Sequence, residues 1–202
     1  MKRPMRFVGD VAQLPAYGHG HRSLTWWGTM GFVAIESMAF VLTIGIYLYL
    51  AGHTPEWPPH GNQPALTFGT TFLALIVLSI APNVWLNRRA RAENLSTVRL
   101  GLVVMSLVGL ALLAIRVFEF PALGVSYKES AYGSVTVTLL GLHTTHLATD
   151  VMDTLVVTAL MFTRHGRARR FVDVSDNAIY WNFVVVAWVP IYLVIYFGPR
   201  WL

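Results

Sequence analysis

The chain has 202 residues, of which 55% are hydrophobic and 12% are charged. A soluble domain carries roughly 25% charged residues, so this composition excludes an ordinary water-facing surface. The formal net charge of +5 does not indicate nucleic acid binding, because the basic residues are dispersed and are not gathered on one soluble face. The lack of cysteine excludes a disulfide framework, a thiolate site and an iron–sulfur cluster.

Five apolar stretches are each long enough to cross a membrane as a helix, which takes roughly 20 residues. They cover residues 26–51, 66–86, 98–118, 134–162 and 179–197. They are too long and too continuously apolar for the strands of a membrane barrel. The sequence therefore predicts an all-α, polytopic membrane protein, with a bundle of five transmembrane helices in one domain, residues 26–202. Residues 1–25 form a polar, basic tail, so the first span is expected to direct insertion without a cleavable signal.

The basic residues predict the orientation of the bundle. Of the fifteen Lys and Arg residues, twelve lie before the first span or near every second loop after it. These twelve are Lys2, Arg3, Arg6, Arg22, Arg88, Arg89, Arg91, Arg99, Arg164, Arg167, Arg169 and Arg170. Short loops rich in Lys and Arg stay on the cytoplasmic side of a bacterial membrane. We therefore predict a cytoplasmic N-terminus and, after five crossings of the inner membrane, a periplasmic C-terminus.

The first two spans contain one unusual residue each. Glu36 lies ten residues after Trp26, about 15 Å along a helix that rises 1.5 Å per residue, and is expected near the membrane midplane. A carboxyl group at that depth is predicted to be protonated or hydrogen-bonded. In the second span, Pro82 is expected to kink the helix because it has no amide hydrogen to donate.

The third and fifth spans carry polar residues near one end. Arg116 and Glu119 lie three residues apart at the outer end of the third span, a spacing that favours an ion pair on a helix. A simple pair at the membrane interface is the plainest interpretation. Asn182, near the start of the fifth span, is expected to donate a hydrogen bond to a neighbouring helix.

The fourth span contains a polar stripe. His143, His146, Asp150 and Asp153 are spaced i, i+3, i+7 and i+10, so they project from one side of a helix that must face other helices. His and carboxylate groups at such spacings can bind a metal in a bundle, but those sites also take Glu and Glu-x-x-His ligands from facing helices. The favoured interpretation is a hydrogen-bonded polar seam that holds helices together.

The residues indicate no self-sufficient redox or catalytic centre. Haem ligation by two histidines takes His on two facing spans, whereas the other five histidines lie in tails or loops. A phosphate-binding Gly loop and a nucleophile elbow are also missing from the sequence. The pattern therefore favours a subunit of a larger complex over a stand-alone enzyme.

Motifs along nearly the whole chain resemble subunit III of the haem–copper respiratory oxidases. Residues 27–47 resemble the Trp-Gly…Ser-Glu…Phe…Tyr helix of that family, and Glu36 falls on its characteristic membrane glutamate. Residues 54–59 resemble its Pro-rich outer loop, and residues 116–119 occupy the place of its Gln-x-x-Glu.

The later spans carry the resemblance further. Residues 132–146 resemble the Tyr-Gly-Ser…Gly-x-His-x-x-His helix of the family, and residues 180–196 resemble its final Tyr-Trp-His-Phe-Val…Trp…Tyr helix. The matches occur in the family's order, on the expected spans and with the expected orientation. The chain is similar to short bacterial members with five spans, which lack the first two spans of the longer ones.

The sequence also departs from the family pattern. Asn182 replaces the usual His, Val185 stands where an Asp is common, and Arg116 replaces Gln. Asp150 and Asp153 are acids that the pattern does not predict in the fourth span. We hypothesise that the polar network has been relocated, which requires that Asp150 or Asp153 lies within hydrogen-bonding distance of the fifth helix.

The resemblance implies a non-catalytic core subunit of a proton-pumping terminal oxidase that oxidises cytochrome c and reduces O₂ to water. Haem and copper are expected in subunits I and II and not in this chain. The chain is expected to stabilise subunit I, to bind phospholipid in a cleft and to support proton uptake. Its interior and lipid-cleft network is expected to comprise Glu36, Arg116, Glu119, His143, His146, Asp150, Asp153 and Asn182. None of these is predicted to be catalytic or to bind a metal.

Other functions stay open at this point. The departures fit a subunit III-like accessory protein of nitric oxide reductase, and a quinol oxidase subunit III is also open because other subunits decide the electron donor. A stand-alone metal- or proton-handling membrane protein, built on Glu36 and the polar stripe, would contain stoichiometric metal and lose it when His143 is changed to Ala. A transient assembly factor is a further alternative.

Overall fold

Helices make up the regular structure of the chain, as the sequence predicts. The computed structural model describes residues 21, 23–61, 63–163 and 168–202, and these ranges contain no strand, which confirms the all-α class. The long helices are α1 (Leu24–His53), α2 (Leu66–Leu78), α3 (Ile80–Arg91), α4 (Leu95–Ala122), α5 (Ala131–Phe162) and α6 (Ala168–Tyr192). The short elements are η2 (Pro59–Gly61), η3 (Leu193–Phe197) and α7 (Gly198–Trp201).

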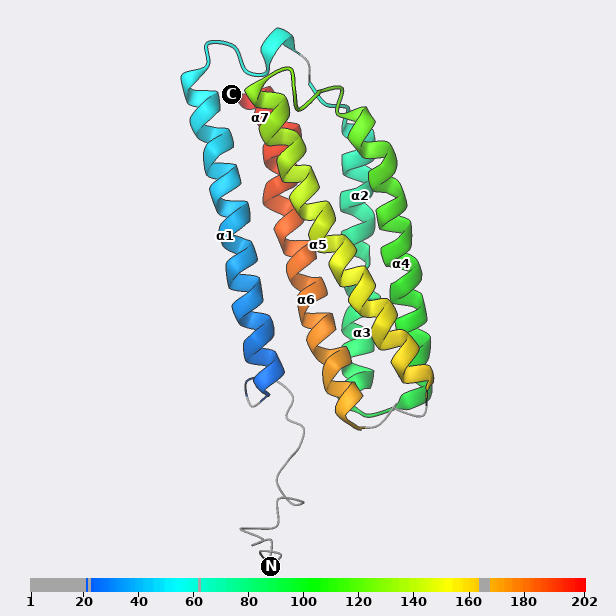
Figure 1. The fold of residues 1–202 in the computed structure, drawn as a ribbon. Helices are drawn as coiled ribbons and strands as arrows, with labels where there is room; N and C mark the ends of the chain where they lie inside the picture. The colour runs from blue at the N-terminus through cyan, green and yellow to red at the C-terminus, as the bar shows by residue number, and fades with distance from the viewer. Residues whose placement is uncertain (1–20, 22, 62, 164–167) are drawn as a thin grey trace, which may run out of the picture.

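The long helices lie side by side in one bundle (Figure 1). The start of α1, the turn from α3 to α4 and the start of α6 lie at one end, and the Pro-rich segment and α7 lie at the other. Arg88, Arg89, Arg91 and Arg99 therefore share an end with the starts of α1 and α6, in agreement with the charge pattern. Which side of a membrane this end faces stays a prediction. Lys2, Arg3, Arg6, Arg22, Arg164 and Arg167 lie outside the described residues.

Four segments of the described chain are long and apolar enough to cross a membrane. They are Leu24–His53, Leu66–Arg91, Leu95–Ala122 and Phe171–Trp201, which contain four of the five predicted spans. Helix α5 is not among them, although its 32 residues extend about 48 Å and pack against α1, α4 and α6. Its polar stripe lowers its apolar content, so the fifth crossing stays a prediction.

The second predicted span is interrupted at Ser79, three residues before Pro82. Pro82 has no amide hydrogen to donate to the carbonyl of Leu78, so a regular helix does not continue through this point. The Ser79 hydroxyl donates to the Ile76 carbonyl at 2.6 Å and accepts from the indole of Trp181 at 2.8 Å. The bond from Trp181 connects Ser79, between α2 and α3, to α6.

The last helix changes its winding near its end. Helix α6 continues through the π-helical turn η3 into α7, and a π turn holds more residues than an α turn. Tyr196, in η3, is 1% exposed. Arg200, in α7, donates to the carbonyl of Pro64 at 3.0 Å. The end of the chain is thereby fixed to the segment that precedes α2.

Helices α4 and α5 approach each other closely at Gly109. A Cβ atom at this glycine would lie 2.5 Å from Cγ2 of Val151 in α5. Val151 is 2% exposed and β-branched, so burial and its restricted χ1 limit how far its side chain can move. Small residues at such contacts allow membrane helices to approach closely.

We expect Gly109→Ala to destabilise the bundle by about 1–3 kcal/mol, the usual cost of overpacking a filled core. Unfolding by a denaturing detergent, followed by circular dichroism in mixed micelles, measures this change. Gly141→Ala in α5 is the matched control, because a Cβ atom there meets nothing within 4 Å. Both variants gain the same helix propensity, so equal stability of the two would contradict the close contact.

Candidate functional site

Polar side chains from most of the helices meet inside the bundle in three neighbouring groups. The Arg116 cluster comprises Arg116, Glu119, His143 and Tyr196. The Glu36 cluster comprises Glu36, His146 and Tyr180. The aspartate cavity is lined by Asp150, Asp153, Asp173, Asp176 and Asn177, among others. The predicted stripe of the fourth span is therefore divided among three sets of neighbours.

The Arg116 cluster contains a buried ion pair. Arg116 is 1% exposed and Glu119 is fully buried. Nη1 of Arg116 donates to Oε2 of Glu119 at 2.6 Å, and the Tyr196 hydroxyl donates to Oε1 at 2.6 Å. The guanidinium carbon lies 3.6 Å from the ring centroid of Phe72 and 3.9 Å from that of Trp188, an arrangement that stabilises the cation. The predicted i,i+3 pair is present, but it is enclosed by other helices and is more than a simple interfacial pair.

The same arginine fixes the protonation of His143. Nη2 of Arg116 lies 2.8 Å from Nδ1 of His143, and Nε2 lies 3.0 Å from the carbonyl oxygen of Val184. A guanidinium group only donates and a carbonyl only accepts, so Nδ1 accepts and Nε2–H donates. His143 is therefore a neutral imidazole with both nitrogen atoms occupied, and it joins α4 to α6.

The Glu36 cluster connects three helices through one carboxyl group. The Tyr180 hydroxyl donates to Oε2 of Glu36 at 2.6 Å, and Nε2 of His146 lies 3.1 Å from Oε1. Nδ1 of His146 lies 2.5 Å from the Leu142 carbonyl and must donate to it. One proton therefore lies between Nε2 and Oε1, carried by one of the two groups. Glu36 is 8% exposed, and the hydrogen bonding predicted for it is present.

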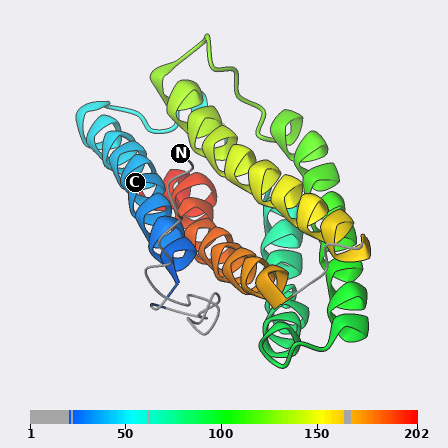
Figure 2. The same cartoon turned by 60° about the horizontal axis from the view of Figure 1, so that its bottom comes forward.

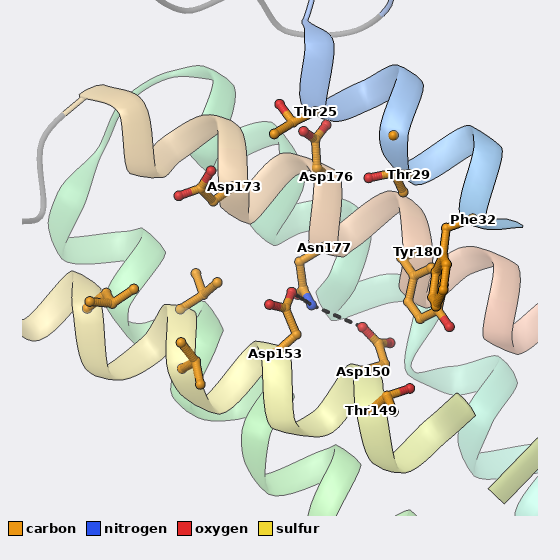
Figure 3. A pocket seen from close by; sticks show the side chains of 14 residues that line it. Thr25, Thr29, Phe32, Thr149, Asp150, Asp153, Asp173, Asp176, Asn177 and Tyr180 are labelled. Atoms are coloured by element: carbon orange, nitrogen blue, oxygen red, sulfur yellow. Dashed lines mark hydrogen bonds between the residues drawn. The ribbon is translucent and has the colours of Figure 1, made fainter. Parts of the chain in front are cut away.

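The aspartate cavity opens between α1, α5 and α6 and has a volume of about 660 Å³ (Figure 3). Asn177 in α6 lies between two acids of α5: its Nδ2 donates to Oδ1 of Asp150 and to Oδ2 of Asp153, each at 3.0 Å. Oδ1 of Asn177 accepts from the Thr154 hydroxyl at 3.2 Å. Both acids of the fourth span thus lie within hydrogen-bonding distance of α6, the helix that contains the fifth predicted span.

Asn182 lies apart from these groups. Its Oδ1 accepts from Nδ2 of Asn83 in α3 at 3.0 Å, and the same Nδ2 donates to the carbonyl of Ala178 at 2.8 Å. Asn182 therefore bonds to a neighbouring helix, but as an acceptor and not as the expected donor. It joins α6 to α3 on a side of α6 away from the polar stripe.

Several residues of the site are not among those predicted from the sequence. The predicted fifth span begins at residue 179, whereas α6 begins at Ala168, so Asp173, Asp176 and Asn177 lie outside the predicted span. Their i, i+3, i+4 spacing is the signal that would have found them, because it places all three on one side of a helix. Tyr180 entered only through the family resemblance.

The hydrogen bonds of the site join several helices to one another. Among residues 21, 23–61, 63–163 and 168–202, no three His, Cys, Asp or Glu side chains are grouped so that they could hold a metal ion. His143 uses both ring nitrogen atoms for bonds to neighbours, and so does His146. The Glu36 cluster and the aspartate cavity bring several carboxyl groups, an imidazole and a phenol close together.

We expect Glu119→Gln to destabilise the bundle by about 3–5 kcal/mol, because removing one partner of a buried ion pair leaves the other charge uncompensated. Detergent-induced unfolding followed by circular dichroism measures the change. Glu129→Gln, at an exposed position, is the control and should stay within about 0.5 kcal/mol of the unaltered chain. A similar small effect of both substitutions would show that the Arg116 charge does not depend on Glu119.

Comparison with known proteins places the chain in a family. The family model described as "Cytochrome c oxidase subunit III" matches residues 20–200. The chain is 24% identical over 188 residues to "Cytochrome c oxidase subunit 3" of Thermostichus vulcanus, covering 91% of this chain and 92% of the relative. It is 26% identical to the proteins of that name from Alkalihalophilus pseudofirmus, covering 82% of each chain, and from Synechocystis sp., covering 90% and 79%. The bundle, with its glutamate on α1 and its paired histidines on α5, is thus that of a member of the cytochrome c oxidase subunit III family.

Proposed function

We propose that the chain is a non-catalytic core subunit of a proton-pumping terminal oxidase, which passes electrons from cytochrome c to O₂ and forms water. The match of the family model over residues 20–200 is the observation that carries this proposal. Haem and copper would lie in subunits I and II. This chain would pack against subunit I, bind phospholipid and support proton uptake.

Two features of the bundle support a membrane position with five crossings. Helix α5 lies between α1, α4 and α6, and its polar side chains reach partners on those helices, so it can cross without exposing them to lipid. The basic residues of α3 and α4 share an end with the starts of α1 and α6, which favours a cytoplasmic N-terminus and a periplasmic C-terminus. The bacterial inner membrane is the corresponding location.

The exposed side of α1 supports contacts with lipid or with subunit I. Helix α1 lies at the edge of the bundle, beside α6 (Figure 2), and packs mainly against α5 and α6. Only 17% of the most apolar 18-residue stretch of α1 is buried inside the bundle. Ile35, Met38 and Leu42 are each more than half exposed. Such a helix finds an apolar environment either in lipid or against a larger neighbouring subunit.

The histidines and acids of the interior support a structural role in place of redox catalysis. Each histidine in α5 is already bonded through both ring nitrogen atoms, and the one buried arginine of the Arg116 cluster is paired with Glu119. These bonds join α1, α4, α5 and α6 into one body. A rigid body of this kind would hold subunit I and its proton entrance in a fixed geometry.

A pull-down through a tag on this chain in mild detergent, followed by an optical spectrum and metal analysis, tests the proposal. We expect stoichiometric haem and copper on larger partner chains, none on this chain, and phospholipid in the recovered complex. Untagged cells are the control for non-specific recovery. A chain recovered alone, or with a metal of its own that is lost in His143→Ala, would overturn the proposal.

The recovered complex also separates the alternatives within this class. Reduction of O₂ with cytochrome c as donor is the expected activity. Oxidation of quinol instead of cytochrome c would identify the parent as a quinol oxidase. Reduction of nitric oxide in place of O₂ would favour the accessory protein of nitric oxide reductase. Recovery of the partners only during assembly, and not from mature membranes, would favour an assembly factor.

A further inference from the structure

The aspartate cavity lies at the end of the bundle that carries the basic loops. Thr25 from the start of α1 and Asp173 from the start of α6 line its outer part, and Asp150 and Tyr180 line its inner part (Figure 3). The lining side chains also become more buried in the same direction: Asp153 is exposed, whereas Asp150 is 1% exposed. The cavity therefore leads from the surface toward the interior of the bundle.

Asp150 has one carboxylate oxygen without a hydrogen-bond partner. Its Oδ1 accepts from Asn177, whereas its Oδ2 is buried and has none. A buried polar atom that lacks a partner costs free energy, so it indicates a group that the protein supplies with something else. The residue lines the cavity, so whatever completes the bonding of Oδ2 arrives from there.

The charges around Asp150 favour a proton on this carboxyl group. Asp153 on the same helix and Glu36 on α1 carry carboxyl groups that act electrostatically on Asp150. Asp173 and Asp176 on α6 also line the cavity, and each has an interaction partner of its own. Among the described lining residues there is no Lys or Arg. From α4, the charged residues Arg99, Arg116 and Glu119 are bonded to Met161, His143 and Tyr196 and not to Asp150. Protonation relieves the repulsion between acids so placed.

A metal cation is a weaker candidate for the same place. The acids are spread along the wall of a cavity of about 660 Å³, and within the described part of the chain no three of them are grouped for metal coordination. A proton needs only one acceptor atom, and Oδ2 of Asp150 is such an atom.

The Glu36 cluster contacts the cavity through Tyr180. Tyr180 lines the cavity together with Asp150, and its hydroxyl donates to Oε2 of Glu36 at 2.6 Å. Oε1 of Glu36 in turn lies 3.1 Å from Nε2 of His146. A hydroxyl group both donates and accepts, so Tyr180 can release its proton to Glu36 while it accepts another from the cavity side.

We propose that the aspartate cavity is a proton inlet, that Asp150 is its proton-binding site, and that Tyr180 connects it to the Glu36 cluster. In the loading step a hydronium ion that has entered the cavity transfers a proton to Oδ2 of Asp150, which forms an O–H bond and leaves a water molecule. The assignment of the mouth to the cytoplasmic side rests on the orientation proposed above. The proton-binding site itself does not depend on any partner subunit.

Infrared spectroscopy of the full chain in lipid nanodiscs tests the inlet. We expect a band of a protonated carboxyl group that shifts in D₂O, changes with pH and is missing from Asp150→Asn. Glu129→Gln, at an exposed position, should leave the band unchanged. A chain without a titrating carboxyl band, or a band that survives in Asp150→Asn, would overturn the proposal.

A second pair of variants tests the route without altering any acid. Gly28 lines the cavity, and Gly31 on the same helix does not; a Cβ atom at either position meets nothing within 4 Å. We expect Gly28→Phe to slow deuterium exchange of the carboxyl band at least tenfold by filling the cavity, and Gly31→Phe to leave it unchanged. Equal exchange rates in the two variants would overturn the inlet. All these measurements use the isolated chain, so they are independent of whether an oxidase is recovered with it.

Discussion

A guanidinium group enclosed by membrane-crossing helices is the constraint on which the rest of this bundle depends. Removing such an ion from water costs several kcal/mol even after relaxation, and the cost is offset only when every partner is in place. The carboxylate comes from the same helix, α4, the imidazole from α5, the hydroxyl from η3 and the two aromatic faces from α2 and α6. Five segments are therefore positioned by one cation, and a displacement of any of them would expose its charge to an apolar surrounding.

Helix α5 depends on its neighbours in the same way. Its histidines and acids separate it from the four segments that are apolar enough to cross a membrane, and it is also the helix whose polar groups have partners on α1, α4 and α6. Polar side chains in a membrane are tolerated where they face protein and form hydrogen bonds. The bundle thus supplies α5 with its polar surroundings, and α5 supplies the bundle with the contacts that join its outer helices.

The sequence predicts the outline of this fold well, because the length of an apolar stretch and the position of basic loops are local properties. It also predicts that the stripe of α5 faces inward. It does not predict which helix each residue meets: His143 and His146 are three residues apart, yet one bonds to Arg116 and the other to Glu36. That division depends on the angles between helices, which no local spacing contains. The sequence does not predict Asn177 as part of the site for a different reason. Helix α6 begins well before its apolar part, so the apolar stretch does not include this residue.

The π turn η3 determines the direction in which the side chains at the end of the chain point. Each residue of a helix advances its side chains by about 100°, so one residue more or fewer rotates everything that follows. Gly198, beyond the turn, lies against Tyr47, and Arg200 reaches Pro64. Loss of a single residue within the turn would allow a regular α-helix to form, yet it would swing both contacts away from their partners. Length in this segment is therefore as constrained as sequence, and relatives that share the contacts of Arg200 are expected to keep the same number of residues there.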